Sequence, residues 1–102
     1  MVITRLQMIL TVEELGRINV IQNADEGLTI ITDVHGMTCV KARKFINNII
    51  NVVREKFRLI VIHGYVHGTA IKAMLTKYSN CHVCRKYTDS YNYGVTHMLI
   101  AP

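Results

Sequence analysis

Several kinds of residue are scarce in this sequence of 102 amino acids, and each scarcity excludes a class of protein. The chain has one proline, no tryptophan and no low-complexity or Pro/Ser-rich tract, so nothing marks a linker between domains. Its longest apolar runs, such as 59–62, are four or five residues, against the ~18 or more that a membrane helix needs. We therefore expect no membrane-spanning segment.

The residues that are present fit one compact domain. The apolar fraction is 50%, and a chain of this length buries about two-thirds of its unfolded surface, which is enough for a core without disulfides or metal. Residues 1–5 lack the basic, then apolar, then small-residue order of a secretory signal, which predicts a cytoplasmic protein. Its three cysteines should then be reduced.

Positive charge is concentrated in the second part of the chain. Residues 1–32 carry two basic and four acidic side chains, whereas residues 33–102 carry ten basic and three acidic ones, a net charge of +7. A small domain with such a field favours polyanions, and nucleic acid is the commonest polyanion in the cytoplasm. Because many basic proteins use Lys and Arg only for solubility, charge alone does not assign a partner.

A strand, a helix and a second strand follow one another in the middle of the chain. Residues 28–34 form a β-branched apolar run bounded by Gly27 and Gly36, which predicts a buried strand. Apolar residues recur every three or four positions over 38–56, which predicts an amphipathic helix. The apolar run 58–62 predicts a second buried strand, parallel to the first because a helical crossover joins them. We expect this crossover to be right-handed.

The rest of the chain completes a mixed sheet. Helical spacing over 70–78 predicts a second helix, and residues 82–87 and 95–100 predict two strands joined as a hairpin through the turn residues 89–94. The predicted order is β-α-β-α-β-β. We expect an α/β fold class, built as an α+β two-layer sandwich with two helices packed on the sheet.

Residues 1–27 allow two interpretations. Residues 11–16 fit a capping box followed by a short helix, whereas the apolar residues within 6–10 and 18–20 fit edge strands equally well. We expect this segment to be an extension packed on the same domain as residues 28–102, where it covers exposed sheet or contacts a partner chain.

Polar residues gather where the two parallel strands are expected to end, an edge of the sheet that we call the rim. The first strand ends in residues 33–36 (Asp-Val-His-Gly) and the second in residues 63–68 (His-Gly-Tyr-Val-His-Gly), each followed by a helix. Neighbouring strands lie ~4.8 Å apart, so His35 and His63 are expected within reach of one phosphodiester. Helix N-termini and glycine backbone favour anions, which predicts a phosphate cradle at the rim.

The order of these motifs resembles the small MutS-related (Smr) domain. The resemblance covers roughly residues 28–100 and rests on 33–36, 63–68, Lys72 and 94–96. The resemblance implies nucleic-acid binding and, for several relatives, endonuclease cleavage of DNA or RNA. It also implies a fold similar to the C-terminal domain of translation initiation factor three.

Two positions depart from the Smr pattern. Thr32 stands where the family has Leu, and Val66 replaces the middle glycine of the His-Gly-x-Gly-x-Gly motif. A β-branched residue disfavours positive φ and narrows the approach of backbone to an anion. His67 adds an imidazole that the pattern does not require. The candidate phosphate-binding residues are Gly36, Lys41, Lys44, Gly64, His67, Gly68, Lys72 and Gly94.

The candidate catalytic residues are Asp33, His35 and His63. In RNA cleavage one histidine would deprotonate the 2′-hydroxyl, the other would protonate the leaving oxygen, and Asp33 would orient an imidazole. Lys72 and helix-end N–H groups would stabilise the phosphorane charge. In the structural alternative, Asp33 caps the turn, His35 packs on the sheet and His63 hydrogen-bonds across the rim.

We expect no required cofactor. Mg²⁺ or Mn²⁺ held by Asp33 and the histidines is the metal-dependent alternative, ranked lower because one carboxylate is a small ligand set for a hard cation. Cys81 and Cys84 form a lone C-x-x-C, which favours three buried thiols, Cys39 included, over a zinc site.

Basic and aromatic residues elsewhere have a binding and a structural interpretation. Residues 41–44 either follow a phosphate backbone or form the solvated face of their helix. Three tyrosines near the hairpin loop lie beside two basic residues, and they either stack on unpaired bases or are ordinary strand and turn residues. The tyrosines are Tyr87, Tyr91 and Tyr93, and the basic residues are Arg85 and Lys86.

The sequence therefore predicts a nucleic-acid-binding, Smr-like domain with endonuclease activity and a slight preference for RNA over DNA. The alternative is a non-catalytic module that binds branched DNA, structured RNA or ribosomes through the same rim. A third interpretation is an enzyme acting on a small phosphorylated molecule.

Overall fold

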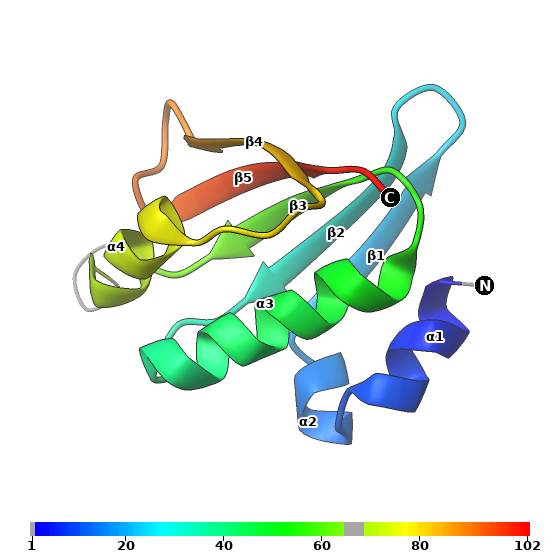
Figure 1. Cartoon of the computed structure of the whole chain (residues 1–102), viewed down its shortest axis with the longest axis horizontal. Coiled ribbons are helices and arrows are strands. Elements are labelled where there is room, and N and C mark those ends of the chain that lie inside the picture. The colour runs from blue at the N-terminus through cyan, green and yellow to red at the C-terminus, as the bar shows by residue number, and fades with distance from the viewer. Residues whose placement is uncertain (1, 65–68) are drawn as a thin grey trace.

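The computed structural model describes residues 2–64 and 69–102, which form four helices and five strands (Figure 1). In chain order these elements are α1 (Val2–Ile9), α2 (Val12–Leu15), β1 (Ile18–Asn23), β2 (Gly27–Asp33), α3 (Cys39–Val53), β3 (Phe57–Ile62), α4 (Thr69–Lys77), β4 (Val83–Thr88) and β5 (Val95–Ile100). The general α/β class is confirmed, and each helix and strand predicted over 28–100 has a counterpart. Within the described residues, none of the helices has the length and apolar character needed to span a bilayer.

The five strands form one mixed sheet in the order β1-β2-β3-β5-β4. As predicted, β2 and β3 are parallel neighbours, and β4 and β5 form an antiparallel hairpin. The expectation of two helices was too small, because α1 and α2 precede the predicted core and β1 adds a fifth strand beside β2. Helices α1, α3 and α4 lie along one face of the sheet, which gives two layers (Figure 1).

The elements that form the rim follow from simple local patterns. Alternate side chains of β2 and β3 are buried beneath the helices, as the period of a strand requires. Helix α3 begins after Thr38, whose Oγ1 accepts the N–H of Lys41 at 3.2 Å. The helix ends at Val53, before the predicted end at Lys56, because Arg54 adopts the left-handed conformation with φ 58°.

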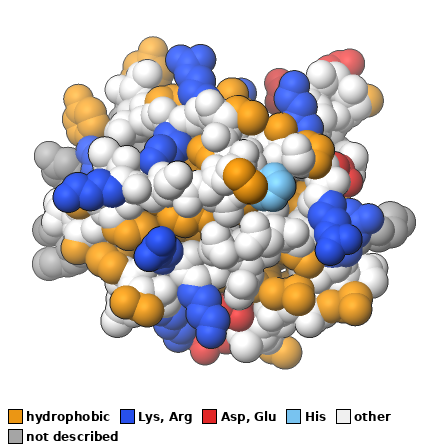
Figure 2. Space-filling model, in the orientation of Figure 1, with side chains coloured by type: hydrophobic (Ala, Val, Ile, Leu, Met, Phe, Trp, Pro, Cys, Tyr) orange, Lys and Arg blue, Asp and Glu red, His pale blue; other side chains and the backbone are white. Residues whose placement is uncertain are grey.

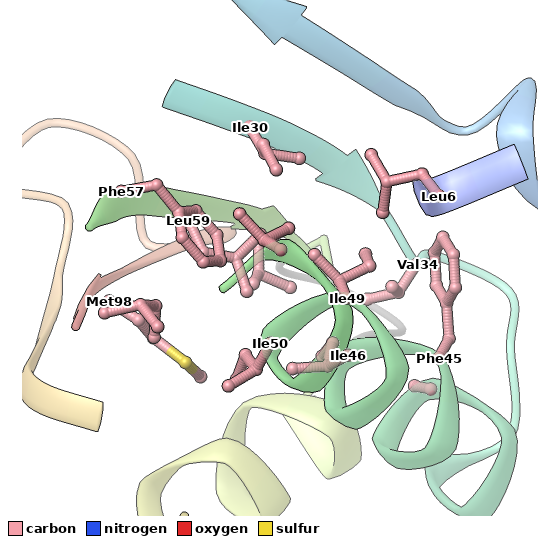
Figure 3. Packing of buried hydrophobic residues seen from close by; sticks show 14 of the residues in the cluster. Leu6, Ile30, Val34, Phe45, Ile46, Ile49, Ile50, Phe57, Leu59 and Met98 are labelled. Carbon is pink, nitrogen blue, oxygen red and sulfur yellow. The ribbon is translucent and has the colours of Figure 1, made fainter. Parts of the chain in front are cut away.

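The core lies between the sheet and α3. Phe45, Ile46 and Ile49 of α3 are fully buried against Leu59 of β3 and its neighbours (Figure 3). Leu6 of α1 is also fully buried and joins the same cluster (Figure 3). Helix α1 is therefore part of the core rather than an appendage.

Residues 2–23 resolve the two interpretations of the N-terminal segment. The Thr11–Glu14 capping box is present: Thr11 Oγ1 accepts the N–H of Glu14 at 3.1 Å, and the Glu14 carboxylate accepts the N–H of Thr11 at 2.9 Å. The strand interpretation is correct for 18–20, which lie in β1, and wrong for 6–10, which belong largely to α1. Val2, Leu6 and Leu10 recur every four residues and bury one helical face. The guanidinium of Arg5 donates to the carbonyl oxygen of Val53 at 2.8 Å and ties α1 to the end of α3.

Candidate functional site

The carboxyl ends of β2 and β3 lie side by side, as the rim hypothesis requires. Asp33 is opposite Ile62 in the parallel register, and the N–H of Val34 donates to the carbonyl oxygen of Ile62 at 2.9 Å. The two His-Gly motifs therefore leave adjacent strands at the same level of the sheet.

Asp33 and His35 form an exposed pair at this rim. The Asp33 carboxylate accepts the backbone N–H of His35 at 3.0 Å, and the same oxygen lies 2.5 Å from Nδ1 of the ring. Because a carboxylate only accepts, this contact places a proton on Nδ1 and leaves the lone pair of Nε2 available. The His35 side chain is 68% exposed and Asp33 is 38% exposed, so a ligand can reach both.

Arg17 supports this pair, and the sequence did not indicate it. Its guanidinium donates to the carbonyl oxygens of Asp33 and His35, both at 3.2 Å. Its own carbonyl oxygen accepts the N–H of Asp33 at 2.9 Å. The residue lies just before β1, so a contact between the N-terminal segment and the rim holds the end of β2. The role of Arg17 could have been predicted only if the pairing of β1 with β2 had been known.

His63 is buried beneath the rim, and both of its ring nitrogens are engaged. Nδ1 donates to the Gly64 carbonyl at 2.8 Å, so Nε2, 2.8 Å from the Thr96 hydroxyl, accepts its hydrogen bond. Burial lowers the pKa of His63. The hydrogen bond to Gly64 acts in the opposite direction and raises this pKa, whereas the positive charge of Lys72 lowers it further. The structure thus brings His35 to the rim surface and keeps the imidazole of His63 inside, as a neutral clamp between β3 and β5.

The burial of His63 gives a pH dependence of stability. Its folded pKa lies below the 6.5 of the unfolded chain, so the unfolded state binds more protons as the pH falls below 6.5. The free energy of unfolding should therefore decrease below pH 6.5, by up to about 1.4 kcal/mol per pH unit for this one group, down to the folded pKa. Urea denaturation from pH 5 to pH 8 measures it. His63→Gln should flatten the profile in this window, and an unchanged slope would contradict the assignment.

Three glycines shape the backbone around this pair of strands. Gly36 and Gly64 have φ values of 81° and 83°, which side chains other than glycine rarely adopt. A Cβ on Gly64 would lie 3.9 Å from Cβ of His35, so the two motifs meet at this point. Gly94 packs on the Gly64 backbone, where a Cβ would come within 3.0 Å of the Gly64 carbonyl carbon. Its carbonyl oxygen accepts the N–H groups of His63 and Gly64 at 2.9 and 3.1 Å, so Gly94 has a structural role at the rim.

Lys72 and the hairpin loop lie next to the rim. The ammonium of Lys72 lies 5.4 Å from the centre of the Tyr93 ring, within cation–π range. The loop is held by Asp89, whose carboxylate accepts the N–H groups of Tyr91 and Asn92 at 2.9 and 3.1 Å. The pKa of Asp89 is lowered, mainly by the hydrogen bond from His97 and to a smaller extent by the one from the backbone N–H of Tyr91. Tyr91 is 100% exposed on this loop and open to stacking by a base.

The strand residues of the hairpin have structural roles. The Lys86 ammonium donates to the carbonyl oxygens of Leu75, Thr76 and Tyr78 at 3.0, 3.0 and 2.6 Å, at the end of α4. Tyr87 stacks on His97 with ring centres 4.9 Å apart, and the Arg85 guanidinium lies 5.3 Å from the centre of the Tyr87 ring. Lys86 and Tyr87 therefore do not present their polar or aromatic groups freely to a nucleic acid.

Basic residues of α3 are exposed on the helical face of the molecule. Lys41 and Lys44 are exposed in the first turns of α3, and Lys44 lines a shallow surface hollow together with Arg43 and Asn47. Figure 2 shows Lys and Arg side chains distributed over this face rather than gathered in one patch. Lys41 and Lys44, which the sequence suggested as phosphate-binding residues, are therefore accessible at the start of α3.

The other candidate residues are those of segment 66–68 and the three cysteines. His67 and Gly68, with the substitution at Val66, lie outside the described residues. The expectation of buried thiols is wrong. Cys81 is exposed in the turn before β4, Cys84 is exposed within the edge strand β4, and Cys39 is half-buried at the start of α3. Over 2–64 and 69–102, no group of three or more His, Cys, Asp or Glu residues is arranged to hold a metal ion.

Comparison with known proteins adds no assignment to this geometry. No family model, curated protein or solved structure matches the chain.

Proposed function

We propose that this protein binds nucleic acid at the rim and cleaves RNA there, with Asp33 and His35 as the catalytic pair. The carrying observation is the exposed imidazole of His35, whose Nδ1 is held by the Asp33 carboxylate and whose Nε2 makes no hydrogen bond within the described residues. This is the arrangement of a general base oriented by a carboxylate.

The proposed reaction is attack of a ribose 2′-hydroxyl on the neighbouring phosphorus. Nε2 of His35 takes the hydroxyl proton, the bond from the 2′-oxygen to phosphorus forms, and the bond to the 5′-oxygen breaks. The departing oxygen takes a proton from water, and the hydroxide that remains takes the proton from His35 Nε2, which restores the neutral imidazole. The preference for RNA over DNA follows, because DNA has no 2′-hydroxyl and the two His-Gly motifs, 33–36 and 63–68, contain one carboxylate, Asp33, for a metal-activated water.

Charged and backbone groups around the pair support phosphate binding. Gly36 has open space where a side chain would lie, so a phosphate can approach its backbone. Neither α3 nor α4 has an acidic residue in its first turn, and Lys41 is exposed at the start of α3. Lys72 lies close enough to His63 to influence its pKa, which puts a cation beside the rim.

We also propose that the chain is an Smr-like domain related in fold to the C-terminal domain of translation initiation factor three. The support is the order of its motifs from Asp33 to Thr96 on adjacent strands. His63 enters this proposal as a positioning residue, because proton transfer by its ring would require it to leave both Gly64 and Thr96.

One observation favours a non-catalytic module that binds structured RNA, branched DNA or ribosomes. The second histidine of the predicted acid–base pair is engaged in the fold, which leaves one imidazole exposed on the described rim. In this alternative the same basic and aromatic groups hold the nucleic acid without cleaving it.

A cleavage assay separates the two functions. We expect the wild-type protein to cleave an end-labelled stem-loop RNA in the presence of EDTA and to leave cyclic 2′,3′-phosphate ends. The same stem-loop with 2′-deoxyribose at the cleaved position should bind with similar affinity and remain intact, because the nucleophile is absent. Binding of both substrates without cleavage of either would instead establish the non-catalytic module. Cleavage that needs Mg²⁺, or that persists in the deoxy substrate, would contradict the proposed reaction.

A further inference from the structure

We propose that strand β1 pairs antiparallel with β1 of a second copy of this chain, which joins two five-stranded sheets into one continuous sheet. The sheet ends on one side at β1 and on the other at β4. Sheet edges carry unpaired N–H and C=O groups that recruit another strand unless the edge is protected. The two edges of this sheet differ in that protection.

The outer side of β1 presents the backbone groups of Ile18, Val20 and Gln22. The N–H of Asp33 donates to the carbonyl oxygen of Arg17, which makes these two residues a hydrogen-bonded pair of the antiparallel ladder. Because such pairs alternate along a ladder, residues 19, 21 and 23 point their backbone groups toward β2, and residues 18, 20 and 22 point theirs away. Within 2–64 and 69–102, β2 is the sole strand paired with β1.

The β1 edge lacks the devices that protect edge strands. Its sequence, Ile-Asn-Val-Ile-Gln-Asn, has no charge and no proline, and its register with β2 runs without a break over all six residues. The opposite edge strand, β4, carries Arg85 and Lys86 and has a register shift between Val83 and Arg85. The β4 edge is therefore protected against pairing with another strand, whereas the β1 edge can accept one.

A groove with a mixed lining runs beside the open edge. It has a volume of about 320 Å³ and lies between α1 and β1, with apolar walls that include Ile3, Ile18 and Val20 and polar side chains from Gln7 and Asn19. Ile3 is 56% exposed at this groove, and Ile21 on the other face of β1 is 43% exposed. A strand added to β1 would place alternate side chains against Ile3 and cover this apolar surface.

Symmetry and charge favour a second copy as the added strand. In a symmetric antiparallel pair, the two-fold axis lies midway between one residue and the same residue of the other copy. It cannot lie between two neighbouring residue pairs, because symmetry would make those pairs identical, whereas neighbouring pairs of an antiparallel ladder differ in hydrogen bonding. Val20 is the central one of the three outward residues, and its self-pairing sets Ile18 opposite Gln22 on both sides. The Arg17 end of each strand then lies near the partner's turn, which carries Asp25 and Glu26. Residues 1–32, with two basic and four acidic side chains, also avoid the repulsion expected between two basic halves.

Matched variants at Gln22 test the backbone pairing. We expect sedimentation velocity, over a concentration range on the order of 1 to 500 μM, to show a reversible dimer. Gln22→Pro removes an outward N–H in each copy and leaves the β1–β2 ladder intact, so the dimer should weaken roughly thirtyfold. Gln22→Ala keeps that N–H and should dimerise like the wild type. Ile21→Lys, which puts two positive charges near the axis, should also weaken the dimer and serves if the proline variant fails to fold.

Amide hydrogen exchange locates the interface at the same time. At high protein concentration the amides of Ile18, Val20 and Gln22 should exchange more slowly than at low concentration, while those of Asn19 and Ile21 are protected at both. A monomer throughout the concentration range would overturn the proposal. A dimer whose β1 amides show no dependence on concentration would overturn it equally, because the copies would then meet elsewhere.

Discussion

Replacing His35 by alanine should lower the rate of RNA cleavage by roughly 10²–10⁴-fold, the contribution typical of one general base. The ring is exposed and its Nδ1 is held by Asp33, so it can accept a proton at Nε2 without rearrangement of the fold. RNA affinity should change little, because the groups proposed to hold phosphate are backbone amides and lysines. Single-turnover rates with saturating protein and a labelled stem-loop RNA measure the chemical step, and titration by anisotropy measures affinity.

His82 provides the matched control for this substitution. Its side chain is half-buried at the opposite end of the sheet, with Nδ1 3.2 Å from the Ala101 carbonyl oxygen. His82→Ala removes the same imidazole and should leave the cleavage rate within about twofold of the wild type, since it is remote from the rim. Asp33→Asn should lower the rate while His35 remains in place, because an amide does not stabilise the protonated ring. Wild-type cleavage by His35→Ala would remove this residue from the mechanism.

Replacing Leu6 by alanine should lower the free energy of unfolding by about 2–5 kcal/mol. Leu6 is fully buried in the main core although it belongs to the N-terminal helix α1. A small domain has only about 5–15 kcal/mol of stability, so this loss is a large part of the total. Urea denaturation followed by circular dichroism gives the value, and the wild type should unfold in a single transition if α1 and the sheet form one cooperative unit.

Ile9→Ala is the control for Leu6→Ala on the same helix. Ile9 is 51% exposed, so its truncation should change the free energy of unfolding by no more than about 0.5 kcal/mol. Equal effects of the two substitutions, or a wild-type midpoint for Leu6→Ala, would mean that α1 detaches from the core in solution.

The parallel pair of strands at the rim was predictable from local patterns. The apolar runs 28–34 and 58–62 and the helical spacing between them predict a strand-helix-strand unit, and the structure has that unit in parallel register. The N-terminal helix was harder to predict because residues 2–10 are mostly apolar on a short segment, where strand and helix periods are difficult to separate. Arg17 was invisible for another reason, since its partners are backbone atoms 16 and 18 residues away.

The different positions of the two histidines also had a signal in the sequence. Phe57, Leu59, Val61 and His63 follow one another at every second position, and the first three are buried, so His63 continues their inward direction. Asp33 and His35 occupy the opposite phase of β2 and its continuation and face solvent. Proximity of strand ends predicted that the motifs meet, but side-chain alternation decides which imidazole a ligand can touch.

Arg5 and Lys86 each place a positive charge at the C-terminal end of a helix. Arg5 neutralises the carbonyl end of α3 through Val53, and Lys86 does the same for α4 through three carbonyl oxygens. These side chains compensate the negative poles of both helix macrodipoles, while the first turns of α3 and α4, at the positive poles, carry no acidic residue. An anion that approaches the N-terminal end of either helix therefore meets a positive pole whose opposite, negative pole is already compensated within the fold.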